Sequence, residues 1–180
     1  KFAPVPLQAL LRNRATLLGR PRAETSRLAD LVELCLLRSQ RPAIGIAGLR
    51  QALAANLDGR QKYVTRLWEN EAAAIGALLD RLEAALLPIS KLLEAPLLDA
   101  PAFAAALCAT LAALTAAPEG ETEPALPGRD ELLAWAAALL PVTVGPSFPP
   151  LGLDTVLAAL MAGCEVRPSR PGRTDIAIWG

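Results

Sequence analysis

Three arginines near the carboxyl end of the sequence have a spacing that suits contact with phosphate groups. Arg167, Arg170 and Arg173 recur at every third residue of a segment rich in proline and glycine. Because such a segment is extended, it can present the guanidinium groups along one edge, a geometry compatible with a nucleic-acid backbone. The alternative is a flexible basic connector between two domains.

A second basic cluster lies near a predicted turn close to the amino end. Its members are Arg12, Arg14, Arg20 and Arg22. Arginine makes bidentate contacts with phosphate, so this cluster is a second candidate for nucleic-acid binding. A solvated basic face is the alternative interpretation.

Charge is distributed unevenly although the formal net charge is zero. Residues 1–66 carry twelve basic and four acidic side chains, whereas residues 67–165 carry three basic and thirteen acidic ones. A zero net charge gives no support to general binding of polyanions by the whole chain. Any nucleic-acid contact is therefore expected to be local.

The residue types that most catalytic and metal sites need are missing or badly spaced. The sequence has no histidine, and its three cysteines, Cys35, Cys108 and Cys164, form no CxxC pair. A zinc site or a Cys–His or Ser–His catalytic unit is therefore not expected. The acidic run at 119–123 lacks the spacing of a calcium loop, and no glycine-rich loop suits a phosphate. We expect no catalytic residue, cofactor or metal within the sequence.

The spacing of apolar residues predicts an all-α fold that positions these side chains. The expected helices cover about 6–13, 26–41, 45–57, 61–88, 100–116, 130–140 and 154–163. Thr25 or Ser26 is expected to cap the second helix, and Pro88 should end or kink the fourth. Trp68 and Trp135 fall on apolar faces and are expected in the core. Cys35 and Cys108 lie in apolar helical patterns, which predicts buried free thiols in a reducing compartment.

The end of the sequence differs from the helical part. An Arg-, Pro- and Gly-rich connector is followed by a short apolar run at 175–179 that is typical of a β-strand. A solitary strand has backbone groups that need partners, and the sequence does not begin with Met. We therefore expect a piece of a larger protein, with a helical domain at 1–163 and, at 164–180, a connector and the first strand of a truncated domain.

No membrane segment or signal peptide is predicted. The longest stretch without charge, residues 132–153, is interrupted by four prolines, which a membrane-spanning helix would not carry. The expectation is a soluble protein with no membrane partner.

Both ends of the sequence resemble a known protein family. Residues 2–11, FAPVPLQALL, resemble the FAPV-x-LLALLKHP stretch of the AddB subunits of bacterial AddAB helicase–nucleases, especially alphaproteobacterial ones. Residues 157–180 resemble that family's LLAG…VRPRYG-x-HPR-x-AILG stretch, and residues 41–50 are similar in style. The family's two histidines are absent here, because residues 12–14 read Arg-Asn-Arg and the second His-Pro is replaced near Gly172. The family's PLEARL and NEG-x-WP runs would follow directly after this chain.

The resemblance implies a place in a larger enzyme. The helical part would be similar to the 2B subdomain of UvrD/RecB-type helicases, and residues 175–179 would begin the resumed motor domain. The parent protein would process DNA double-strand breaks for recombination in the bacterial cytoplasm, together with an AddA-type subunit. Its ATP and Mg site, its nuclease carboxylates and its iron–sulfur cluster would lie outside residues 1–180. This segment would be non-catalytic and would contact duplex DNA or the AddA-type partner.

A second hypothesis comes from a different class of protein. A stand-alone helical domain can bind a protein partner through an apolar groove, although such a domain should have no orphan strand. If the segment is instead an insertion cut from its motor domain, its docking surface is exposed, and it is expected to self-associate at high concentration.

Overall fold

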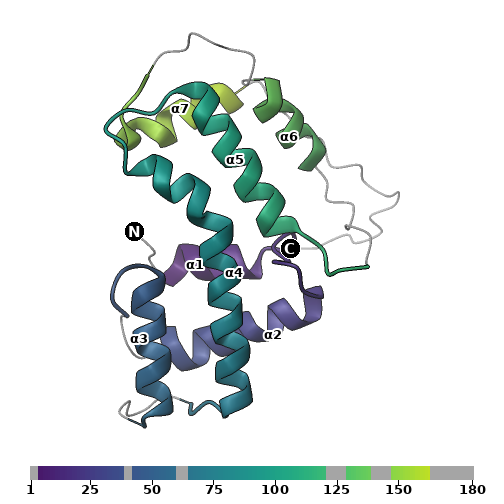
Figure 1. Ribbon diagram of the computed structural model, residues 1–180, viewed down its shortest axis with the longest axis vertical. Helices are drawn as coiled ribbons and strands as arrows, with labels where there is room; N and C mark the ends of the chain where they lie inside the picture. The colour runs from purple at the N-terminus through teal and green to yellow at the C-terminus, as the bar shows by residue number, and fades with distance from the viewer. Residues whose placement is uncertain (1–3, 39–41, 60–64, 121–128, 139–146, 163–180) are drawn as a thin grey trace, which may run out of the picture.

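The computed structural model describes residues 4–38, 42–59, 65–120, 129–138 and 147–162, and this part of the chain is mostly helical (Figure 1). Its elements are α1 (Pro4–Arg12), α2 (Arg22–Val32), the π-helical turn η1 (Glu33–Leu37), α3 (Gly45–Leu57), α4 (Glu69–Leu93), α5 (Ala100–Thr115), α6 (Arg129–Ala138), the 3-10 turn η2 (Pro150–Gly152) and α7 (Leu153–Met161). The described residues contain no β-strand, which confirms the all-α prediction for them. The expected strand at 175–179 and the domain boundary at 163–164 lie outside the described residues.

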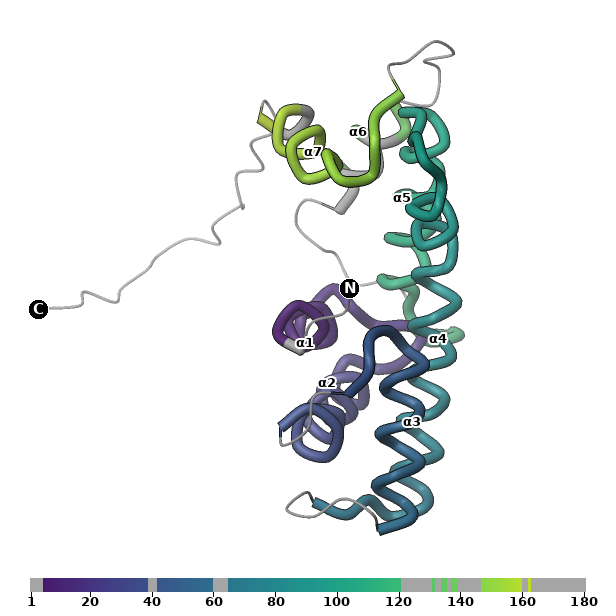
Figure 2. The backbone as a smooth tube through the Cα atoms, turned by 90° about the vertical axis from the view of Figure 1, so that its left-hand side faces the viewer, coloured from purple at the N-terminus to yellow at the C-terminus, as the bar shows by residue number. Residues whose placement is uncertain are grey.

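Helix α4 is the longest of the described helices, and α2, α3 and α5 pack against it. It has 25 residues, with α2 and α3 packed beside its first part. After the turn at its end, α5 returns along α4, and this pair forms the most extensive helix contact. Figures 1 and 2 place α6 and α7 near the carboxyl end of α4, at the end of the molecule away from α3.

The main hydrophobic core lies between α1, α2, η1, α3 and the first two thirds of α4. Four α4 side chains at helical spacing have no exposed surface: Ile75, Leu78, Leu79 and Leu82. Their i, i+3, i+4, i+7 pattern forms the apolar stripe expected of a packed helix. Each such burial stabilises the fold by about 2 kcal/mol before the entropy cost of ordering is counted. Leu114 also belongs to this core and comes from the far end of α5.

A smaller apolar contact joins the start of α5 to the segment before α7. The N–H of Leu98 donates to the carbonyl of Phe148 at 2.8 Å, and the N–H of Phe148 donates back at 3.0 Å. The rings of Phe148 and the buried Phe103 pack in a T-shaped arrangement with centroids 6.3 Å apart. This contact lies beyond the main core, at the end of the molecule where α4 ends.

The start of α4 corrects two expectations. The helix was expected from about residue 61 but begins at Glu69, because Leu67 is buried in extended chain and its N–H donates to Asn56 Oδ1 at 3.0 Å. Trp68 was expected in the core, yet its side chain is 74% exposed. Trp68 is the residue before the helix, and its N–H donates to the Glu71 carboxylate at 3.1 Å. The Glu71 side chain therefore caps the helix while the indole faces solvent.

Pro88 lies inside α4 and does not end it, since the helix continues to Leu93. Proline has no N–H to donate to the carbonyl four residues earlier, and its ring crowds that turn. A bend is the usual consequence, and Figure 1 shows α4 changing direction in its second half. Pro88 was expected either to end or to kink the helix, and the structure shows a kink.

Some of the other helix ends and core residues agree with the predictions, and others differ. Helix α3 and the start of α5 agree with prediction, and the Asp99 carboxylate caps α5 by accepting from the N–H of Ala102 at 2.6 Å. Helix α2 begins at Arg22 after Pro21, so neither Thr25 nor Ser26 is its cap. Cys108 and Trp135 are only half-buried, whereas Cys35 is fully buried.

Candidate nucleic-acid interface

Four of the seven arginines expected at a nucleic-acid interface lie in the described residues. Helix α1 ends at Arg12, the following turn carries Arg14 and Arg20, and Arg22 begins α2. The other three, Arg167, Arg170 and Arg173, lie outside the described residues.

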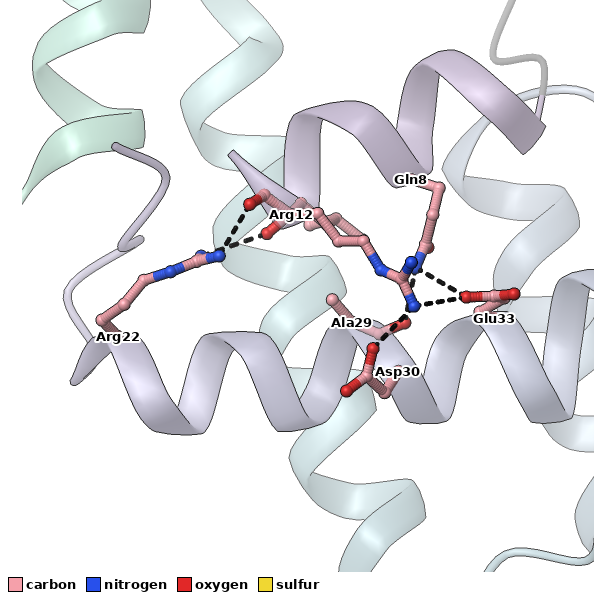
Figure 3. A network of polar contacts seen from close by, with 7 residues as sticks. Gln8, Arg12, Arg22, Ala29, Asp30 and Glu33 are labelled. Carbon is pink, nitrogen blue, oxygen red and sulfur yellow. Dashed lines mark hydrogen bonds and ion pairs between the residues drawn. The ribbon is translucent and has the colours of Figure 1, made fainter. Parts of the chain in front are cut away.

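Arg12 is held between two carboxylates of the neighbouring helix (Figure 3). Its Nη2 lies 2.8 Å from Asp30 Oδ1 and 2.6 Å from Glu33 Oε2. Gln8 Nε2 donates to the same Glu33 oxygen at 3.2 Å. The charge of Arg12 is therefore balanced by two carboxylates at the surface of the fold, where the contacts join α1 to α2 and η1. Because these groups are partly exposed, each ion pair stabilises the fold by only about 0.2–1 kcal/mol.

Arg22 caps the end of α1 (Figure 3). Its Nη2 donates to the carbonyl of Arg12 at 2.7 Å, and its Nη1 lies 3.3 Å from the carbonyls of Leu11 and Thr16. The last carbonyls of a helix have no partner within it and carry partial negative charge. The guanidinium of Arg22 satisfies them, which explains an arginine at this position without any ligand.

Arg14 and Arg20 differ although both belong to the same turn. Arg20 is ion-paired with Glu24, and its side chain is only 14% exposed. Arg14 is exposed and forms no hydrogen bond or ion pair with any described residue. Arg14 is therefore the member of the described cluster that is available to a phosphate group.

Several other arginines also form ion pairs or hydrogen bonds within the fold. Arg50 of α3 is held between Asp80 and Glu83 of α4, and hydrogen bonds to these carboxylates raise the pKa of Arg50. Arg81 donates to two backbone carbonyls of the α1–α2 turn, and Arg27 lies 3.9 Å from Glu71. The basic excess of residues 1–66 is thus partly balanced by carboxylates from the acidic second part of the sequence.

An open hollow that was not predicted from the sequence lies at the start of α4. It has a volume of about 690 Å³ and is lined by Arg66, Leu67, Trp68, Glu69 and Asn70. An exposed tryptophan beside an exposed arginine can stack on a nucleobase or cover an apolar group of a protein partner. A signal was present in the sequence, because Trp68 directly precedes an acidic run typical of a helix start.

No known relative is identified for this chain. No protein-family model matches it, and neither a curated protein nor a solved structure matches it. The likeness to AddB subunits at the two ends therefore stays a hypothesis.

The described side chains show no arrangement suited to metal binding or nucleophilic catalysis. No three His, Cys, Asp or Glu side chains gather there as metal ligands. Burial, and secondarily the charge of Glu71, raises the pKa of the Cys35 thiol, which keeps this group protonated and unreactive. Among the described helices, none combines the length and the hydropathy that crossing a bilayer requires.

Proposed function

We propose that this chain is a non-catalytic helical module of a bacterial, cytoplasmic DNA double-strand break repair helicase–nuclease, where it positions a partner subunit or duplex DNA. The support is the resemblance of residues 2–11 and 157–180 to AddB subunits. The expected fold is that of a 2B-like subdomain, with residues 164–180 leading into the motor domain. ATP, Mg and an iron–sulfur cluster would belong to other parts of the parent protein.

The proposal names two ligands, duplex DNA and a partner subunit. The pairing of the arginines within the fold is the observation that decides between them. Arg12, Arg20 and Arg22 have partners inside the fold, so the described part of the basic cluster offers little free positive charge. Large apolar side chains are exposed instead, among them Trp68. Tryptophan is enriched among the residues that contribute most to protein interfaces. The described helices are therefore better suited to a protein partner, such as an AddA-type subunit, than to a phosphate backbone.

DNA contact is assigned to the arginines that remain. Arg14 is free in the described residues, and Arg167, Arg170 and Arg173 keep the spacing that suits successive phosphates. Four such contacts would give a limited electrostatic affinity that falls with salt, by about 0.9 in the slope of log K against log salt concentration per phosphate.

The second candidate is a stand-alone helical interaction domain. The hollow beside Trp68 favours it, because an exposed aromatic side chain in a concave site is typical of peptide and helix recognition. This candidate needs neither DNA nor an AddA-type subunit.

The deciding experiment measures binding of the chain to a labelled duplex with a single-stranded tail over a salt series. Replacing Arg14, Arg167, Arg170 and Arg173 together with alanine should reduce the salt slope by about 3–4. The control is Arg12→Ala, which removes a paired arginine and should leave the slope unchanged.

A parallel titration with a purified AddA-type subunit distinguishes the remaining hypotheses. Trp68→Ala should weaken that binding by about tenfold or more, whereas removal of the exposed Val5 side chain should not. Binding to neither DNA nor the AddA-type subunit would contradict the proposal and favour the stand-alone interaction domain.

A further inference from the structure

The turn between α1 and α2 lies against the carboxyl end of α5, as Figures 1 and 2 both show. The N–H groups of Leu17 and Leu18 both donate to the carbonyl of Leu114, at 2.8 and 3.1 Å. The N–H of Gly19 donates to the carbonyl of Ala116 at 2.7 Å. Carbonyls in the last turn of a helix lack partners within it. Here a turn nearly one hundred residues earlier in the sequence caps them.

Other elements hold the opposite side of this turn. Arg81 of α4 donates through Nη1 to the carbonyls of Leu18 and Gly19, at 2.8 and 2.7 Å. The hydroxyl of Thr25 in α2 donates to the carbonyl of Leu17 at 3.0 Å. All six backbone polar groups of residues 17–19 are therefore satisfied, by groups on α2, α4 and α5.

The backbone of this turn adopts a conformation that it would not keep by itself. Leu18 has a φ of 55° and Gly19 a φ of 67°. A positive φ is uncommon for a leucine, and such residues persist only where the surroundings enforce them. The contacts with α4 and α5 supply that enforcement, so their loss would let the turn relax.

Helix α5 packs mainly on α4 and supplies Leu114 to the main core cluster. Leu114 is its buried member in the main core cluster, and Ala113 is partly buried against it. The other buried members come from α1 to α4, η1 and the segments that connect them. Toward the α1–α3 side, the end of α5 is thus held by three hydrogen bonds and by the burial of Leu17, Leu18 and Leu114, and regions held by few buried contacts open before the rest of a protein does.

We propose that residues 17–19 and the last turn of α5 form a latch that opens as a unit while the core of α1 to α4 stays folded. Opening frees the end of α5 and the chain that follows it from the α1–α3 side. It also uncovers Leu17, Leu18 and Leu114, which are buried when the latch is closed. Opening of the latch therefore exposes an apolar surface that is buried in the closed state. This inference does not depend on the proposed DNA-repair role.

Amide hydrogen exchange of the intact chain tests the latch. The amides of Leu17, Leu18 and Gly19 should exchange about tenfold or more faster than those of residues 75–82 in α4. Arg81→Gln removes the charged donor to the turn and should accelerate exchange of the latch amides by a further factor of about ten. The α4 amides should change by less than about twofold. Equal acceleration at both sets of amides would mean global unfolding and would overturn the proposal.

Two glycine variants distinguish disruption of the latch contacts from the general cost of placing alanine at a positive φ. In Gly19→Ala the new Cβ would lie 2.8 Å from Arg81 Nη1, at a φ of 67°. Gly59→Ala imposes the same backbone penalty at a φ of 68°, with no neighbour within 4 Å. Gly19→Ala should accelerate exchange of the latch amides, and Gly59→Ala should not.

Hydrogen exchange of the unmodified chain over a series of urea concentrations tests the latch even if a variant fails to fold. Latch opening exposes Leu17, Leu18 and Leu114, a small part of the surface that global unfolding exposes, so exchange of the latch amides should depend more weakly on urea concentration than that of the α4 amides. The same urea dependence at both sets of amides would overturn the latch.

Discussion

Arg12 and Arg14 are two residues apart and have opposite roles. Arg12 is the last residue of α1 and reaches the carboxylates of Asp30 on α2 and Glu33 at the start of η1. Arg14 lies beyond the helix end, where no carboxylate of the described chain reaches it. A basic cluster in a sequence is therefore not yet a basic surface. Whether an arginine is free depends on which acidic side chains the fold brings to it.

The two described cysteines should differ in reactivity. Cys35 is fully buried and Cys108 half-buried, and only a thiolate reacts with an alkylating reagent. In the native protein at neutral pH, Cys108 should react with iodoacetamide many times faster than Cys35. Peptide mass spectrometry after timed quenching measures both rates, and equal rates would contradict the burial of Cys35.

The raised pKa of Cys35 also predicts a pH dependence of stability. As the pH rises above 9.0, the ordinary thiol pKa, Cys35 of the unfolded chain loses its proton while that of the folded chain keeps it. The free energy of unfolding should therefore fall from that pH upward, until the raised pKa of the folded state is passed. Urea unfolding should show a smaller alkaline loss in Cys35→Ala than in Cys108→Ala.

At the scale of elements, a buried amide decides where η1 and α4 lie. Asn56 of α3 donates through Nδ2 to the carbonyls of Cys35 and Thr65, at 3.3 and 3.0 Å, and its Oδ1 accepts from the N–H of Leu67. Buried backbone groups without partners would cost about 1–3 kcal/mol each. Asn56 satisfies those left by the π-helical turn and by the extended approach to α4. It thereby keeps residues 65–67 out of the helix.

Two helical glycines should respond to alanine with opposite signs. At Gly48 in α3 an added Cβ would lie 1.7 Å from the carbonyl oxygen of Ala43, which is backbone and cannot rotate away. We expect Gly48→Ala to destabilise the protein by about 3 kcal/mol or more. At Gly76 in α4 an added Cβ would have no atom within 4 Å apart from the backbone of the helix itself, so Gly76→Ala should stabilise the protein by about 0.5–1 kcal/mol through helix propensity.

Thermal unfolding measures both glycine variants. A change of 1 kcal/mol shifts Tm by about 2–4 °C in a protein of this size. A lower Tm for both variants would show that α4 is also crowded at Gly76.

At the scale of the whole molecule, many charged side chains are paired across the fold, whereas several large apolar side chains are exposed. Charges that are segregated along the sequence meet in the fold, as Arg50 of α3 does with Asp80 and Glu83 of α4. Large apolar side chains remain exposed, among them Leu97 and Leu151, the latter at 95%. Leu97 directly precedes Leu98 and Leu151 follows Phe148 by three residues, so both lie in the segments that the contact between Leu98 and Phe148 joins. This end of the molecule therefore has an apolar surface without a partner in the described chain.

We expect the isolated chain to self-associate through this surface at high concentration. Light scattering should give a mass that rises with concentration, and the double variant Leu97→Glu with Leu151→Glu should lower that mass at equal concentration. Val5→Glu is the matched control, because Val5 is also exposed but lies on α1. A monodisperse monomer at all concentrations would contradict this prediction.

The sequence by itself determined the elements whose signals are local. The bounds of α3 follow from its apolar spacing and from the Asp58-Gly59 turn, and the start of α5 follows from the Asp99 cap. Apolar periodicity also identified the buried stripe of α4. Such signals lie within one or two helical turns, so they can be read without knowing the fold.

Only the tertiary structure decided the features that depend on distant partners. The late start of α4 depends on Asn56, and the role of Arg81 depends on the carbonyls of Leu18 and Gly19, more than sixty residues earlier in the sequence. The candidate interface changed for the same reason, because carboxylates and helix ends occupy Arg12, Arg20 and Arg22. A hydrogen bond or ion pair requires a partner within about 3–4 Å, and which groups come that close is settled by helix packing.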